Sequence, residues 1–237
     1  MTSPNNLSIL IDPWRNDPSG AWGLWFFEKF PEIYADIATS THAHFDHDAV
    51  HRVHAPVVLE RPVGKYSLGD VDILGFADKH MYKAKGSYLW TEAFDESNIK
   101  LPPNNPLNLD NSIILIKTGG ISIVHWGDNR PDPQEYVLKA VKNADVLILP
   151  IDDSEHILTS ADIKTIISYV NPKVIIPAHY KTKGAVSTLS TLKSADEWVK
   201  SNADFLLLKS ASYEFDIDII TKFNKKVVYF GDNYIKK

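Results

Sequence analysis

The chain contains no cysteine among its 237 residues. A disulfide framework is therefore excluded, and any metal site must be built from histidine and carboxylate side chains. Basic residues are not in excess either, because the net charge is −5 and the isoelectric point is about 6.0. This balance lacks the positive footprint of a nucleic-acid-binding domain. We therefore expect no nucleic-acid partner.

Long apolar runs are also missing, since no segment approaches the about 20 residues that a membrane-spanning helix needs. Residues 1–6 lack the basic and apolar regions of a secretory signal peptide. A Gly-x-Ser-x-Gly nucleophile elbow is absent as well. These absences predict a cytoplasmic protein that does not associate with membranes and needs no serine or cysteine nucleophile.

What the chain does have is enough apolar material for one large core, with 44% hydrophobic residues. Proline and glycine are dispersed, and we find no internal repeat or linker. We therefore predict a single domain over residues 1–237.

Three histidines and a carboxylate stand close together in the stretch Thr41–Asp48, directly after an apolar run that predicts a buried strand. Residues two apart on an extended segment project to the same side, so His42 and His44 can converge on one point. Asp46 and His47 follow where the chain is expected to turn, and they can face a second point. Imidazole and carboxylate groups suit zinc, iron or manganese. The spacing predicts two metal ions side by side, and the alternative is a polar surface cluster.

A second candidate lies at the end of residues 173–180, an apolar run that predicts a buried strand ending in His179. Before it, residues 145–150 predict another buried strand, and a helix capped by Ser160 is expected between the two. Such a strand–helix–strand unit places His179 at a strand tip, where ligand sites of α/β sheets gather. The alternative is a buried structural histidine.

Two further segments stand out by composition. Residues 14–34 are rich in tryptophan and phenylalanine. They could form a wall over the site, a surface through which copies of the chain form a homo-oligomer, or plain core packing. Residues 86–110 are rich in proline and asparagine, and we expect an excursion that edges the pocket.

The pattern His-x-His-x-Asp-His at residues 42–47 resembles the metallo-β-lactamase superfamily at every ligand position. Ile-Asp-Pro at 11–13, Gly-Asp at 127–128 and Pro-Ala-His-Tyr at 177–180 resemble its other motifs in order. The resemblance covers about residues 7–180. It implies an α/β fold, a four-layer αββα sandwich of two mixed sheets flanked by helices. The branch that looks most similar is that of small metal-dependent hydrolases related to the L-ascorbate-6-phosphate lactonases.

The resemblance implies two ligand sets that share one carboxylate. They are His42, His44 and His80 for one ion, Asp46, His47 and His179 for the other, and Asp128 between the two. His125 is the rival of His80, and we place it behind the ligands. Asp12 is expected there too, accepting a hydrogen bond from a metal-bound histidine. Zinc is the expected metal, and manganese or iron also suits these ligands.

The chemistry implied is hydrolysis by a hydroxide that bridges two divalent ions. The expected substrate is a small-molecule ester or lactone, phosphorylated ones included, and the expected catalytic residues are Asp46, Tyr180 and His156. Tyr180 adjoins a ligand, and His156 stands near two carboxylates that can raise its pKa, so either could donate a proton.

Three alternatives remain open at this point. One is a phosphodiesterase or phospholipase-type hydrolase on the same site. Another is a di-iron redox protein, which is less favoured because His44 stands where such proteins commonly carry a carboxylate. The last is a non-catalytic binding protein, which the loss of a ligand would indicate, and none is missing.

Overall fold

The computed structural model describes residues 1–16, 25–81, 110–185 and 191–233, and the fold is given for these residues. The strands are β1 (Ile9–Ile11), β2 (Ile33–Tyr34), β3 (Ile37–Ser40), β4 (Val53–His54), β5 (Val57–Glu60), β6 (Gly64–Leu68), β7 (Val71–Lys79), β8 (Asp110–Thr118), β9 (Ile121–His125), β10 (Val146–Pro150), β11 (Val174–Ala178), β12 (Phe205–Leu207) and β13 (Lys226–Tyr229). The helices are the 3₁₀ helix η1 (Ala49–Arg52) and the α-helices α2 (Glu135–Val141), α3 (Ser160–Val170), α4 (Asp196–Lys200) and α5 (Ile217–Ile220).

The larger sheet has eight described strands in the order β12-β13-β11-β10-β9-β8-β7-β6. It is mixed: β8 pairs antiparallel with both β7 and β9, whereas β9, β10, β11 and β13 run parallel. The β8–β9 hairpin turns at Gly119 and Gly120, and both residues have positive φ angles that favour glycine. This glycine pair between two β-branched runs forms the turn of the hairpin.

The smaller sheet has three described strands in the order β1-β3-β5. All of them run parallel, with Ile9 opposite Ile37 and Ile37 opposite Val57. The fold class predicted above is confirmed, but this sheet is parallel rather than mixed over its described strands. A separate two-stranded pair, β2 with β4, lies beside it.

Side chains that alternate along β8 point into two separate apolar layers, one on each face of the larger sheet. On β8, Ile114 and Ile116 join Ile9 and Ile37 in an apolar cluster between the two sheets. The intervening Ile113 belongs to a second cluster on the opposite face, because successive side chains of a strand point to opposite sides.

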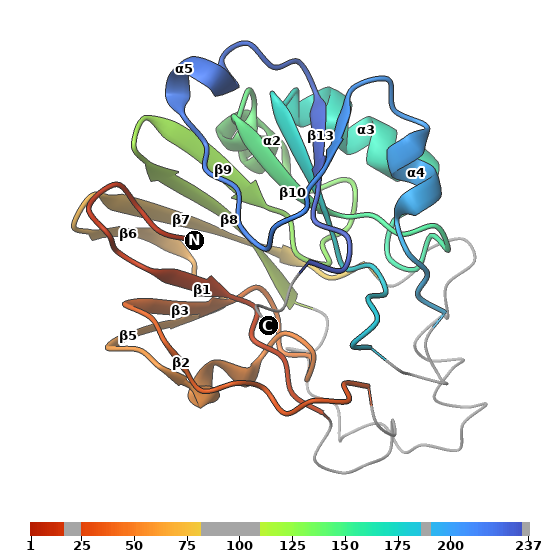
Figure 1. The fold of residues 1–237 in the computed structure, drawn as a ribbon. Helices are drawn as coiled ribbons and strands as arrows, with labels where there is room; N and C mark the ends of the chain where they lie inside the picture. Colours follow the sequence, from red (N-terminus) through yellow and green to blue (C-terminus); the bar gives the residue numbers. More distant parts are fainter. Residues whose placement is uncertain (17–24, 82–109, 186–190, 234–237) are drawn as a thin grey trace.

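That opposite face of the larger sheet is covered by α2, α3 and α4, which Figure 1 shows gathered away from the smaller sheet. The outer side of β3 is covered in turn by η1 and β4, through Ala38, Val50 and Val53. Helix α3 starts with a capping box in which Thr159, not Ser160, is the N-cap and pairs with Asp162. Within the described residues, no helix has the length and apolarity of a membrane span.

The carboxyl ends of several strands meet at one edge of the molecule. Asp12 follows β1, residues 41–47 follow β3, and His80 follows β7. Because β7 and β9 both run antiparallel to β8, they run parallel to each other, and β10 and β11 continue in that direction. Residues after β9 and β11 therefore reach the same edge, where α/β sheets hold their ligands.

The described part of the aromatic segment packs on the loop after β3. Trp14 stacks on Phe26 with ring centroids 4.0 Å apart, and Trp25 meets Phe45 edge-on at 5.3 Å. The amide of Phe27 donates to the carbonyl oxygen of Gly184, a few residues beyond β11. This packing joins both sides of the strand-end edge, in keeping with a wall beside it. The homo-oligomer through residues 14–34 stays a prediction.

Candidate metal centre

The first predicted ligand set comes together at this edge. One nitrogen from each of His42, His44 and His80 lies within 4.8 Å of the other two. His42 and His80 are almost fully buried. The rings of His42 and His44 are perpendicular, with centroids 4.7 Å apart, as expected for side chains that converge on one point.

The second predicted set comes together beside it. Ligand atoms of Asp46, His47 and His179 also lie within 4.8 Å of one another. The Nε2 atom of His47 is 3.4 Å from Asp46 Oδ2, and that of His179 is 3.8 Å from the same oxygen. The rings of His47 and His179 are nearly parallel, with centroids 5.3 Å apart.

Asp128 stands between the two sets. Its Oδ2 atom lies 3.2 Å from His179 Nε2, 3.4 Å from His80 Nε2 and 3.7 Å from the Nε2 atoms of both His42 and His47. One carboxylate oxygen thus faces histidines of both sets. A side chain placed in this way suits a shared ligand.

Gly127 allows this approach. Its φ angle is +59°, and a Cβ atom there would lie 2.5 Å from Asn111 Oδ1 and 2.8 Å from Thr41 Cβ. No real Cβ atom fits such a space, so the position demands glycine. Two non-glycine residues at the same edge also have left-handed backbones, Asp12 at 52° and His179 at 55°. Such strain in side-chain-bearing residues clusters at functional sites.

Asp12 fixes two histidine rings. Its Oδ2 atom is 3.1 Å from His47 Nδ1 and accepts a hydrogen bond of 2.8 Å from the Thr41 hydroxyl. Because that hydroxyl donates to Asp12, it accepts from His42 Nδ1, 3.0 Å away. Both Nδ1 atoms therefore act as donors, and both Nε2 atoms turn to the cluster. The role predicted for Asp12 matches this geometry, whereas Thr41 was not anticipated.

His80 is fixed in the same way and His125 is not. His80 Nδ1 lies against the carbonyl oxygen of Met81, which can only accept, so Nε2 carries the lone pair. His125 Nδ1 instead accepts from the amide of Gly127 at 3.1 Å, and its Nε2 is 3.9 Å from Asp12 Oδ2. Between the two rivals, the structure thus brings His80 into the ligand set and leaves His125 behind Asp12.

Unpaired histidine nitrogens are a second reason why these side chains fit a metal ion. Among the described residues, the buried side-chain nitrogens without a hydrogen-bond partner are His42 Nε2, His47 Nε2, His80 Nε2 and His179 Nδ1. A buried polar atom left unpaired costs about 1–3 kcal/mol. The Nε2 atoms of His42, His47 and His80 face the cluster, where coordination would satisfy them, and imidazole with carboxylate suits a divalent ion.

Charges divide the cluster into two halves. Burial lowers the pKa of His179, but the Asp128 charge and hydrogen bonds to Asp128 and Asp46 outweigh it and raise this pKa to about 10. His47 behaves alike, because Asp46 and Asp128 raise its pKa well above 6.5 against burial. In the first set, burial and the neighbouring His80 lower the pKa of His44 to about 3.

A pH dependence of metal binding follows from this division. His47 and His179 hold protons at neutral pH, and a metal must displace them. We expect binding at the second set to release protons, and its affinity to rise with pH up to about 10. Binding at the first set should release few, since His44 is already neutral. Titration calorimetry in buffers of different ionisation enthalpy measures the released protons, and equal release for both ions would contradict this expectation.

His156 lies beside the second set. Its ring stacks on that of His179 with centroids 5.7 Å apart, and its Nδ1 is 2.7 Å from Thr191 Oγ1. Asp152 Oδ1 accepts a hydrogen bond of 2.9 Å from the His156 amide, which fixes the turn between these two residues. The prediction of a raised pKa is wrong: burial and the His179 charge lower it to about 4, and Asp152 opposes this only in part.

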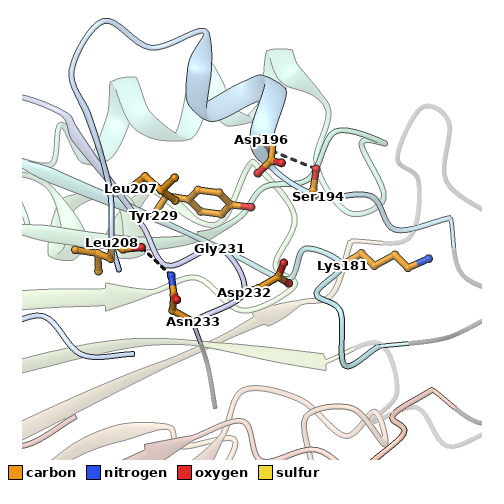
Figure 2. A pocket seen from close by; sticks show the side chains of 9 residues that line it. All are labelled: Lys181, Ser194, Asp196, Leu207, Leu208, Tyr229, Gly231, Asp232 and Asn233. Carbon is orange, nitrogen blue, oxygen red and sulfur yellow. Dashed lines mark hydrogen bonds between the residues drawn. The ribbon is translucent and has the colours of Figure 1, made fainter. Parts of the chain in front are cut away.

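Tyr180 points elsewhere. Its hydroxyl donates to the carbonyl oxygen of Gly231 at 2.9 Å, and burial raises its pKa further above the ordinary value. The structure therefore gives no support to Tyr180 as a proton donor at the cluster. Figure 2 shows the cavity on this side, about 270 Å³ in volume, beside Tyr229 and Gly231. None of the predicted ligands lines it, so this cavity is separate from the cluster.

Some predictions fall outside the described residues. The excursion at 86–110 is described only at Asp110, where β8 begins, and part of the aromatic segment at 17–24 is not described. Sequence reasoning also missed Asp78, although it lies at the end of β7 only two residues before His80, and this spacing was a usable signal.

Comparison with known proteins agrees with this geometry. A sequence profile for the Beta-lactamase superfamily domain matches residues 1–179. A UPF0173 metal-dependent hydrolase of Thermodesulfovibrio yellowstonii is 26% identical over 204 residues, 76% of this chain and 74% of that protein. A UPF0173 metal-dependent hydrolase of Pelotomaculum thermopropionicum is 30% identical over 168 residues, 65% of this chain and 71% of that protein.

Among solved structures, a Thermotoga maritima protein of the metallo-β-lactamase superfamily superposes with a TM-score of 0.58. It is 24% identical and covers 93% of this chain and 88% of its own, so it shows the fold. The chain belongs to the metallo-β-lactamase superfamily. Its relatives there are named metal-dependent hydrolases, and the predicted family, fold and enzyme class are confirmed at this level.

Proposed function

We propose that the protein is a dinuclear metal-dependent hydrolase that cleaves an ester or lactone bond in a small molecule, phosphorylated ones included. The observation that carries the proposal is the position of Asp128 Oδ2, within 3.7 Å of the Nε2 atoms of His42, His47, His80 and His179. The choice of ester or lactone rests on the resemblance of the motifs to the lactonase branch. Zinc is the expected metal.

Two divalent ions in such a site supply a water acidic enough to attack at neutral pH and draw electron density from the oxygen of the scissile group. The chain's own part is to hold the ligands in place beforehand. Asp12 and Thr41 fix the rings of His42 and His47, so that their Nε2 lone pairs face the cluster. Little reorganisation is then needed when substrate binds.

His156 is the side chain best placed to contact the substrate from outside the ligand sets, since its ring lies against His179. Its pKa of about 4 leaves it neutral at pH 7. A general acid works best with a pKa near the operating pH. We therefore assign His156 to hydrogen bonding with the substrate instead of proton donation.

The proposal is tested by metal content and activity of the purified protein. We expect about two zinc or manganese ions per chain and hydrolysis in a panel of lactones, esters and phosphodiesters. His80→Ala should lose metal and activity, whereas the matched variant His125→Ala should keep its metal, because His125 faces Asp12 and Gly127.

Other outcomes would overturn parts of the proposal. Metal loss in His125→Ala but not in His80→Ala would reverse the assignment of the third histidine. If only the phosphodiesters were hydrolysed, the substrate class would be phosphodiesters and not esters or lactones. Two irons with redox-active absorbance would favour an oxidoreductase, and no metal under any loading condition would refute the hydrolase.

A further inference from the structure

Two chain segments run side by side next to the first ligand set. The amide of Met81 donates to the carbonyl oxygen of Asp128 at 2.7 Å, and the amide of Arg130 donates to that of Lys79 at 3.0 Å. Between these bonds, His80 and Asn129 pair as an isolated antiparallel bridge. The residue that carries the third histidine is thus in register with the residue after the shared carboxylate.

A partly buried ion pair ties the same two segments through their side chains. Arg130 donates to Asp78 through Nε at 3.1 Å and through its second amino nitrogen at 2.8 Å. The Asp78 side chain is only 3% exposed. Asn129 Nδ2 also donates to Asp78 Oδ2 at 2.8 Å. A carboxylate with this many charge-assisted and amide donors has a fixed position.

Asn129 is held from its other side as well. Asn111 lies opposite Asp78 in the β7–β8 register, and its Nδ2 donates to Asn129 Oδ1 at 3.1 Å. The same amide donates to the carbonyl oxygen of Trp126 at 3.2 Å. Asn111 and Asn129 are almost fully buried. The strand end before His80 and the loop that carries Asp128 are therefore joined by one closed set of polar contacts.

A role in positioning explains this arrangement better than a role in stability. Taking the Asp78 carboxylate out of water offsets much of its attraction to the partly exposed Arg130, so such an ion pair contributes little net stability and can instead fix geometry. Asp78 stands near the end of β7, two residues before His80, and Arg130 is two residues after Asp128. Such a link controls the distance between His80 Nε2 and Asp128 Oδ2, which is 3.4 Å.

We propose that Asp78, with Arg130 and Asn129, is a positioning residue that sets the metal affinity of the site containing His80. The inference rests on the proposed function, because it assumes that His80 and Asp128 bind metal. Contacts that orient metal ligands are typically worth about 10–100-fold in metal affinity.

The test compares Asp78→Asn with Asp145→Asn. Asp145 is a matched carboxylate of the same sheet that accepts bonds from Lys173 Nζ at 2.6 Å and Ser122 Oγ at 2.7 Å. It lies just before β10, at the opposite strand ends. Under competition with a chelator, we expect Asp78→Asn to hold one of the two ions about 10–100-fold more weakly. Asp145→Asn should retain both ions as the wild type does.

A double variant separates positioning from a general loss of structure. If Asp78 acts through His80, then Asp78→Asn combined with His80→Ala should bind metal no more weakly than His80→Ala alone. Where Asp78→Asn does not fold, Arg130→Lys takes its place, since lysine keeps the charge but not the two parallel bonds.

The outcomes distinguish the two proposals. A wild type without metal refutes the proposed function. A wild type with two ions, together with unchanged affinity in Asp78→Asn or Arg130→Lys, or equal weakening in Asp145→Asn, overturns the positioning role alone. An additive loss in the double variant overturns it too.

Discussion

Replacing Asp128 by alanine is expected to reduce kcat/KM by at least about 1,000-fold, because metal ions supply several kcal/mol of transition-state stabilisation and each 1.36 kcal/mol is a factor of ten. No other described carboxylate oxygen lies within 4 Å of histidine nitrogens from both ligand sets. The variant also leaves the cations of His47 and His179 with only one of the two carboxylates that they share, Asp46. Both metal content and turnover should fall together.

The control is Asp72→Ala, which removes a carboxylate from β7 that pairs with Lys65 at 3.0 Å on the surface. Such pairs are worth about 0–1 kcal/mol, so metal content and turnover should not change. Full metal occupancy in Asp128→Ala would contradict a shared ligand at this position. Steady-state kinetics and metal analysis by mass spectrometry on the same samples decide between these results.

The second large effect concerns Trp126, the largest of the fully buried side chains in the described chain. Its ring packs in the cluster between the larger sheet and the helices, and its Nε1 donates to the carbonyl oxygen of Asn129 at 3.2 Å. Trp126→Ala should lower the free energy of unfolding by about 3–5 kcal/mol, as truncation of a buried aromatic leaves a cavity. Urea unfolding of the metal-free protein measures the change.

Trp126→Phe separates the two contributions. Phenylalanine keeps most of the ring but lacks the N–H, so the Asn129 carbonyl loses its donor at a cost of about 1–3 kcal/mol. The phenylalanine variant should therefore be the more stable of the two. Both variants lack the indole N–H, so their difference reports the packing of the ring alone, and the reverse order would contradict a packing contribution at this position.

The part of the site that the sequence predicted is local. His42, His44, Asp46 and His47 lie within six positions, so their short separation in sequence keeps them together, although they stand in the bends and turn after β3 and not on the extended segment expected. His179 was placed by its position at a strand end. The choice between His80 and His125 needed the fold, because it depends on which carbonyl or amide meets each Nδ1 atom.

What failed depended on partners distant in sequence. The Tyr180 hydroxyl bonds Gly231, 51 residues away, which no local pattern indicates. The pKa of His156 is set first by burial, which only the packed structure determines. The cap of α3 is the exception, because its partner is local: Thr159 and Ser160 are both common caps, and the reciprocal bond with Asp162, three residues on, selects Thr159.

The origin of the ligands in two sheets has a consequence for how the folded state resists opening. Asp12 and residues 41–47 follow strands of the smaller sheet, whereas His80, Asp128 and His179 follow strands of the larger one. Under the proposed function, each bound ion would connect the two sheets across their shared edge. In a chain without cysteine, coordination would then serve as the cross-link between layers, and chelation would act as reduction of a disulfide does elsewhere.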